Sequence, residues 1–214
     1  MDTFYTFDIH EAFMSRALEL ARQGQGKVSP NPMVGCILVK DGEIIGEGYH
    51  EAYGGPHAEV MAYKNAIKEP VDATVYVTME PCSIFSKTPP CTKFLIENSA
   101  SEVYVATLDP NPEVNGNGIA ELIHAGIHVK TGILTEEADS LNRGFTKIMK
   151  HGRPWVIAKA AQSANGFLGM DSDSQTWITG EVSKEHSHNL RAHVDAIMVG
   201  RQTALVDNPK LTVR

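Results

Sequence analysis

One histidine, two cysteines and one glutamate are the residues of this chain best suited to chemistry. They occur in three short stretches, which are His57-Ala-Glu59, Glu80-Pro-Cys82 and Cys91. An imidazole and two thiolates are good ligands for zinc, and three protein ligands leave a fourth position for water, as in catalytic zinc sites. The sequence therefore predicts a zinc site formed by His57, Cys82 and Cys91.

Glu59 has a different predicted task, because it is not needed as a ligand. It lies two residues after His57, near enough to take a proton from a water on the metal. The pattern H-x-E followed by P-C-x-x-C is typical of zinc-dependent base deaminases. The chain departs from that pattern in one respect, since eight residues rather than two separate Cys82 and Cys91.

A purely structural zinc site is the alternative, and it would require a fourth ligand. Cys36 and His50 are the candidates. Cys36 lies in the apolar stretch 34–39 and is most simply a core residue, whereas His50 stands in a Gly-rich loop and is better placed to contact a substrate. Each residue of the group alone would more often be structural. Their combination favours catalysis.

The elements that position these residues follow from the hydrophobic pattern. Helices are predicted over residues 9–21, 57–68, 91–98, 118–125 and 136–149, and strands over 33–40, 43–48, 73–78, 102–106 and 127–130. This order predicts a three-layer α/β/α domain with helices on both faces of a largely buried sheet. Prolines precede both His57 and Cys82, which predicts a helix start at each, where the helix dipole favours a thiolate.

A second segment is predicted to begin near residue 150, where His151-Gly-Arg-Pro154 coincides with a change in charge balance. The first domain is therefore assigned to residues 1–150 and the second to 151–214. The second segment has predicted strands over 155–160 and 195–199 and a helix over 181–192. About 60 residues with so few elements cannot enclose a normal core, so this domain is predicted to be incomplete.

Composition narrows the function classes. The 214 residues are 42% hydrophobic and 21% charged, and the longest uncharged apolar stretches fall far short of the roughly 20 residues that a membrane helix needs. The absence of a visible signal peptide predicts a cytoplasmic protein, and three cysteines are too few for a disulfide scaffold. The net charge of −7 argues against a nucleic-acid partner and favours a small-molecule substrate.

Over its whole length the sequence resembles the bifunctional riboflavin-biosynthesis pyrimidine deaminase/reductase family. The motifs that carry the resemblance in the first domain are Ser29-Pro-Asn-Pro-Met-Val-Gly35, His57-Ala-Glu59, Thr78-Met-Glu-Pro-Cys-Ser83, Thr88-Pro-Pro-Cys91 and Asp109-Pro-Asn-Pro112. Those in the second are Ala158-Lys-Ala-Ala161, Trp177-Ile-Thr179, Leu190-Arg191, Asp195-Ala-Ile-Met-Val-Gly200 and Asp207-Asn-Pro-Lys-Leu-Thr-Val-Arg214. The Thr-Pro-Pro-Cys motif accounts for the long spacing between the zinc cysteines.

The resemblance implies a cytidine-deaminase-like fold for the first domain, with zinc on its three predicted ligands and Glu59 as the proton shuttle. The implied substrate is 2,5-diamino-6-ribosylamino-4(3H)-pyrimidinone 5′-phosphate. It would lose its ring 2-amino group as ammonia to give 5-amino-6-ribosylamino-2,4(1H,3H)-pyrimidinedione 5′-phosphate. Asn31 and His50 match family positions that contact the base, and Lys87 matches a basic position suited to the sugar phosphate.

For residues 151–214 the resemblance implies the N-terminal part of a dihydrofolate-reductase-like domain, which uses NADPH to convert the ribosyl group to ribityl. The matching cofactor positions are Ala161, Trp177, Thr203 and Asp207, and the matching substrate positions are Lys159, Arg191, Leu211 and Arg214. NADPH is expected only where the reductase domain is complete. An uncovered reductase edge predicts self-association or local disorder, and a homo-oligomer is expected.

The sequence departs from the family at two places. Ile84 and Ser86 stand where the family usually has His and Gly, and Ser163-Ala-Asn-Gly-Phe167 stands where it usually has Ser-Leu-Asp-Gly-Lys. Another zinc deaminase, acting on nucleosides or on tRNA adenosine, shares the zinc residues and is one alternative. A non-catalytic zinc-stabilised module is the other.

Overall fold

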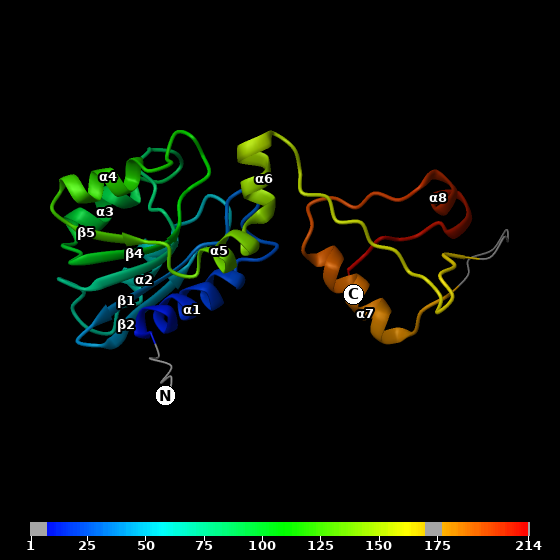
Figure 1. The fold of residues 1–214 in the computed structure, drawn as a ribbon, viewed down its shortest axis with the longest axis horizontal. Coiled ribbons are helices and arrows are strands. Elements are labelled where there is room, and N and C mark those ends of the chain that lie inside the picture. Colours follow the sequence, from blue (N-terminus) through cyan, green and yellow to red (C-terminus); the bar gives the residue numbers. More distant parts are fainter. Residues whose placement is uncertain (1–7, 170–176, 214) are drawn as a thin grey trace, which may run out of the picture. The chain divides into compact units, whose positions relative to one another are not determined.

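A five-stranded mixed sheet forms the centre of the first part of the chain (Figure 1). The structure is a computed structural model, and it describes residues 8–169 and 177–213. The strands are β1 Gly35–Lys40, β2 Glu43–Tyr49, β3 Thr74–Met79, β4 Glu102–Thr107 and β5 His128–Thr131. Their order in the sheet is β2-β1-β3-β4-β5; β1 runs antiparallel to β2 and β3, whereas β3, β4 and β5 are parallel. All five agree with the predicted strands to within two residues.

Helices cover both faces of this sheet, which confirms the predicted three-layer fold. Helices α1 (Ile9–Arg22) and α5 (Thr135–Leu141) pack on one face through a cluster that includes Met14, Ile37 and Tyr76. Helices α2 (Ala58–Lys64), α3 (Cys91–Glu97) and α4 (Asn117–His124) pack on the other. Strands β3 and β4, which are covered on both sides, are almost continuously buried, whereas the edge strand β5 is largely exposed.

Helix α1 lies unusually close to β1. The Asp8 side chain caps the helix by accepting a hydrogen bond from the His10 N–H at 2.9 Å. At Gly35, a Cβ atom would lie only 2.0 Å from the carbonyl oxygen of Ala17. Glycine is therefore required there, and its contact with α1 fixes the start of β1 directly after the loop that carries Asn31.

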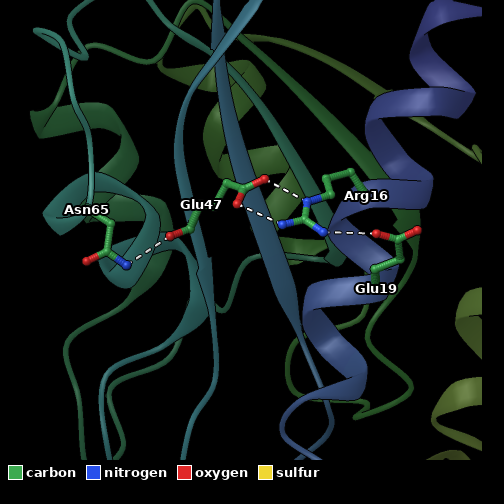
Figure 2. A network of polar contacts seen from close by, with 4 residues as sticks. All are labelled: Arg16, Glu19, Glu47 and Asn65. Carbon is green, nitrogen blue, oxygen red and sulfur yellow. Dashed lines mark hydrogen bonds and ion pairs between the residues drawn. The ribbon is translucent and has the colours of Figure 1, made fainter.

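A polar network ties α1 to the far edge of the sheet (Figure 2). The Arg16 guanidinium donates to both carboxylate oxygens of Glu47 in β2, at 2.7 and 3.0 Å, and to Glu19 at 3.0 Å. The Asn65 side-chain amide donates to the Glu47 backbone carbonyl at 2.9 Å. Because Asn65 follows α2, the network joins elements from both faces of the sheet.

Glu47→Gln is expected to lower the free energy of unfolding by about 0.5–1 kcal/mol at neutral pH, since the ion pair is partly exposed and screened. Hydrogen bonds from Arg16 lower the pKa of Glu47 from its ordinary value of 4.5. The carboxylate therefore stabilises the fold above its unfolded-state pKa, and the contribution is lost as the pH falls through the lower folded-state pKa. Urea unfolding at about pH 7 and about pH 3 measures this. A difference that does not shrink at the lower pH would contradict it.

Two predicted helices are shorter than expected because tertiary hydrogen bonds interrupt them. The helix predicted over 136–149 is divided into α5 and α6 (Arg143–His151). Between them the buried Asn142 side chain accepts from the Met33 N–H and donates to the Met33 carbonyl, both at 2.8 Å. The helix predicted over 57–68 ends at Lys64, after which the Ile67 N–H bonds to the Ile45 carbonyl at 2.7 Å.

The described residues from Val156 onward form a separate compact unit. It contains α7 (Glu181–Ala192), as predicted, and α8 (Arg201–Asp207), which was not predicted. The predicted strands over 155–160 and 195–199 are wrong for the described residues, because neither segment pairs with a neighbouring strand. None of residues 156–169 and 177–213 is buried, so this unit lacks the packed face on which strands assemble.

Across the described parts of the chain, no helix has the length and apolar character needed to cross a membrane.

Candidate metal centre

His57, Cys82 and Cys91 converge at one end of the sheet. Their ligand atoms all lie within 4.8 Å of one another. His57 is the residue before α2, and its side chain makes no cap hydrogen bond with that helix, so the ring is available to the cluster. Cys91 begins α3, whereas Cys82 lies in the irregular stretch after β3. The predicted helix start at Cys82 is therefore wrong: the chain runs through eight more residues before α3 begins.

The geometry of the cluster fits a zinc ion. A tetrahedral zinc with nitrogen at about 2.0–2.1 Å and sulfur at about 2.3 Å requires ligand atoms roughly 3.5–3.8 Å apart. The His57 Nδ1 atom lies 3.2 Å from Cys91 Sγ and 3.5 Å from Cys82 Sγ. On the other side of the ring, Nε2 lies 3.2 Å from the Thr88 hydroxyl, a partner of the kind that orients metal-binding histidines.

The two residues considered as a fourth ligand lie outside this cluster. Cys36 is fully buried within β1, where it packs in the core. His50 is also buried, but both of its ring nitrogens have other partners. The three-ligand arrangement is the one expected of a site with an open position.

Hydrogen bonding between the ligands favours one thiolate. Contact with Cys91 chiefly, and also with His57, lowers the pKa of the Cys82 thiol, although burial opposes this. The Cys82 sulfur and burial together raise the pKa of Cys91. The hydrogen bond to Cys82 is also the main reason why the pKa of His57 is raised. Cys82 is thus held in the thiolate form that binds zinc.

Glu59 is a buried acid beside the ligands. It lies in the first turn of α2 and is only 3% exposed. Burial raises its pKa, and the nearby Cys82 also raises it, while His57 acts in the opposite direction. Interaction with the Cys91 thiol also lowers the pKa of Glu59, but less than burial raises it. A carboxyl with a raised pKa next to a metal site is suited to proton transfer near neutral pH.

Asn31 and His50 lie together next to the metal ligands. The His50 Nδ1 atom is 2.9 Å from the Pro56 carbonyl and must donate to it, so Nε2 accepts from the Asn31 amide at 3.1 Å. Burial lowers the pKa of His50 and favours this neutral form. The His50 ring centroid is 5.5 Å from that of His57. This hydrogen bond uses one hydrogen of the Asn31 amide and fixes the orientation of the amide, including its carbonyl oxygen.

Lys87 is exposed on the loop between Cys82 and Cys91. Its Nζ atom is 3.8 Å from the ring centroid of Tyr53, a cation–π contact that links this loop to the one before α2. Sequence reasoning did not single out Tyr53. The only sequence signal for Tyr53 was that it is an aromatic residue in the Gly-rich stretch after His50.

Glu80 was also missed as a residue with a role of its own. Its carboxylate is 4% exposed and accepts four backbone hydrogen bonds, whose donors are Asp109, Gly116, Gly118 and Ile119, at 2.9–3.3 Å. Its place two residues before Cys82 was the available signal. Burial, helped by the charges of Glu80 and Cys82, raises the pKa of Asp109 to about 6.

The residues matched to the reductase lie in the second unit, and those that the structure describes are exposed or partly exposed. Lys159 and Ala161 are in its first extended stretch, and Trp177 is 64% exposed with Lys184 Nζ 4.2 Å from its ring centroid. The remaining positions are Thr203 and Asp207 in α8, Arg191 in α7, and Leu211. Arg191 donates to the Thr212 carbonyl at 3.2 Å, which brings it beside Leu211. Arg214 lies outside the described residues.

Each of the two parts of the chain matches a known protein family. The family profile described as the cytidine and deoxycytidylate deaminase zinc-binding region matches residues 8–107, a range that contains all three candidate ligands and Glu59. The profile of the RibD C-terminal domain matches residues 154–214. The chain is 45% identical over 207 residues to the riboflavin biosynthesis protein RibD of Aquifex aeolicus, covering 97% of this chain and 58% of that protein.

The RibD of Escherichia coli is 46% identical over 204 residues, which are 95% of this chain and 56% of that protein. The chain belongs to the RibD family. Acinetobacter baumannii RibD superposes with a TM-score of 0.92 at 42% identity, over 96% of this chain and 58% of that chain. A second solved structure, from Thermotoga maritima, is a diaminohydroxyphosphoribosylaminopyrimidine deaminase/5-amino-6-(5-phosphoribosylamino)uracil reductase. It superposes with a TM-score of 0.91 at 42% identity, over 96% of this chain and 59% of that chain. The chain thus spans a little over half the length of these relatives.

Proposed function

We propose that this chain catalyses the zinc-dependent hydrolytic deamination of 2,5-diamino-6-ribosylamino-4(3H)-pyrimidinone 5′-phosphate in riboflavin biosynthesis. The observation that carries the proposal is the convergence of His57, Cys82 and Cys91 on one point, with the buried Glu59 carboxyl beside them. Membership of the RibD family supports the choice of substrate. Release of ammonia from this ribotide, compared with cytidine and with a tRNA stem-loop, separates the proposal from its alternatives.

The residues of the site divide the reaction between them. Zinc, when bound by the three ligands, activates water as a nucleophile. The Glu59 carboxylate takes a proton from the attacking water and delivers it to the ring nitrogen, so that a C–O bond forms at the amino-bearing carbon. Glu59 then carries a second proton, taken from the newly added hydroxyl, to the amino group; the hydroxyl becomes the carbonyl as the C–N bond breaks, and ammonia leaves. Burial of Glu59 keeps bulk water from competing for these protons.

Asn31, His50 and Lys87 orient the substrate in this proposal. The hydrogen bond between His50 and Asn31 fixes which atoms the amide presents to the pyrimidine ring. Lys87 is exposed on the loop between the cysteines, where a mobile ammonium suits a phosphate arriving from solvent.

Lys87→Ala is expected to raise KM for the phosphorylated substrate about tenfold, because one charge-assisted contact is removed. KM for the dephosphorylated analogue should change much less. Steady-state ammonia release with the two substrates measures both. Lys64→Ala, another exposed lysine in the last turn of α2, is the matched control and should leave both values unchanged. An equal loss on both substrates would reject the phosphate role of Lys87.

Residues 151–214 are proposed to belong to an NADPH-dependent reductase domain that follows the deaminase domain of residues 1–150. The matching C-terminal profile supports the assignment. The exposed side chains described in this unit leave the nucleotide unenclosed, whereas dinucleotide sites are concave and bury most of the ligand. NADPH binding would therefore need further residues of a complete reductase domain. A cytoplasmic location and a homo-oligomeric state stay predictions.

A further inference from the structure

Helix α4 contacts the segments that carry both zinc cysteines. On one side, the Glu80 carboxylate accepts the N–H groups of Gly118 and Ile119 in the first turn of α4, at 2.9 and 3.3 Å. The residue before the helix is Gly116, which has no side chain that could cap the helix. The Glu80 side chain therefore caps α4 in place of a residue of its own segment. Glu80 directly follows β3 and lies two residues before Cys82.

The same end of α4 is pressed against the backbone that leads into Cys82. A Cβ atom on Gly118 would lie 2.2 Å from the Pro81 carbonyl oxygen and 3.1 Å from the nearest Glu80 carboxylate oxygen. Only glycine permits this approach. The position of α4 and the position of the Pro81-Cys82 backbone are therefore linked.

On the other side, α4 is bonded to α3 next to Cys91. The hydroxyl of the fully buried Thr92 donates to the Glu121 carboxylate in α4 at 2.6 Å. The Thr92 N–H also donates to the Cys82 carbonyl at 3.2 Å, and the Cys91 N–H lies 3.4 Å from the Cys82 sulfur. Both cysteines are thus connected to one helix through their immediate neighbours.

The loop between the cysteines is poorly suited to setting their separation. Half of its eight residues are exposed, with Phe85 at 75%, none is buried, and its one internal backbone hydrogen bond, from the Ser86 N–H to the Thr88 carbonyl, is long at 3.3 Å. Two ligands joined by such a loop need another connection if they are to meet the same ion at fixed geometry.

We propose that α4 and its contacts with Glu80 and Thr92, together called the α4 brace, hold Cys82 and Cys91 at metal-binding separation. Glu80, Thr92 and Glu121 are positioning residues for the zinc site and touch neither zinc nor substrate. The inference rests on the zinc site of the proposed function. It concerns how tightly that site retains the ion.

The test is the rate at which the zinc-loaded 214-residue chain gives up its metal to an excess of a chromophoric chelator. Thr92→Val removes the hydroxyl donor at nearly constant volume, and Glu80→Gln replaces two acceptor oxygens by one. Both variants are expected to release zinc about tenfold faster or more. Thr92→Ser keeps the donor and should restore release to within about twofold of the parent chain.

Thr135→Val is the matched control. Its hydroxyl donates to the Ala106 carbonyl at 2.8 Å on the other face of the sheet, in contact with neither cysteine segment. Urea unfolding of all variants records their stability, and the cobalt-loaded forms report thiolate coordination through the charge-transfer band. The brace predicts fast release and an altered band for Thr92→Val but not for Thr135→Val.

Each outcome decides the proposal. Parent-like release from Thr92→Val, or equally fast release from Thr135→Val at equal stability, would overturn the brace and leave the proposed deaminase intact. If Glu80→Gln does not fold, the comparison of valine and serine at Thr92 still decides. A parent chain that binds no zinc would overturn both the brace and the proposed function.

Discussion

Glu59→Gln is expected to lower kcat for deamination at least about 100-fold while the chain still holds about one zinc. Glutamine has nearly the same shape as glutamate, but its amide cannot accept the proton of the attacking water or carry it to the ring. Because Glu59 is buried beside the ligands, bulk water should not replace it. Ammonia release and elemental analysis of the same preparation measure the two quantities.

Glu47→Gln is the matched control, since it makes the same substitution in the network that joins α1 and β2. It should lose some stability and keep its rate. A Glu59→Gln variant that loses its zinc would make Glu59 part of the metal site, and one that keeps its full rate would remove it from the mechanism.

Cys82→Ala, Cys91→Ala and His57→Ala are each expected to reduce the zinc content from about one ion per chain to nearly none. Two remaining ligands bind zinc poorly, and an alanine offers no donor atom. Deaminase activity should fall with the metal in all three variants. Elemental analysis after gel filtration measures the loss.

Cys36→Ala separates this effect from the general loss of a buried thiol. Cys36 is fully buried in β1, so its removal should cost stability through a small cavity but leave the zinc in place. The ligand assignment would be contradicted if Cys91→Ala retained a full equivalent of zinc, or if Cys36→Ala lost as much as the ligand variants.

The convergence of His57, Cys82 and Cys91 was predictable from the types of these residues and their spacing in the sequence. His57 and Glu59 are two residues apart, and few other chemistries use this pair with two later cysteines. The layers were predictable as well, since the buried strands are short apolar runs between helical periods. Short apolar runs misled in the second unit, because a strand requires a partner as well as a pattern, and residues 155–160 and 195–199 have none in the described structure.

The features that sequence reasoning missed depend on partners far apart in the chain. Glu80 accepts hydrogen bonds from backbone N–H groups 29 to 39 residues away. Nearly every residue type has a backbone N–H, so such donors cannot be recognised from the sequence. Asn142 ends α5 through a contact with Met33, 109 residues away, although the local pattern of residues 136–149 is that of one continuous helix. Such contacts appear only once the layers are assembled.

The most direct test of the central claim is ammonia release by the zinc-loaded chain acting on 2,5-diamino-6-ribosylamino-4(3H)-pyrimidinone 5′-phosphate. The proposed site predicts one ammonia per pyrimidinedione formed, with the rate abolished by chelation and restored by adding zinc back. If the chain with one bound zinc releases no ammonia from this ribotide, the assignment of His57, Cys82, Cys91 and Glu59 to its deamination is wrong.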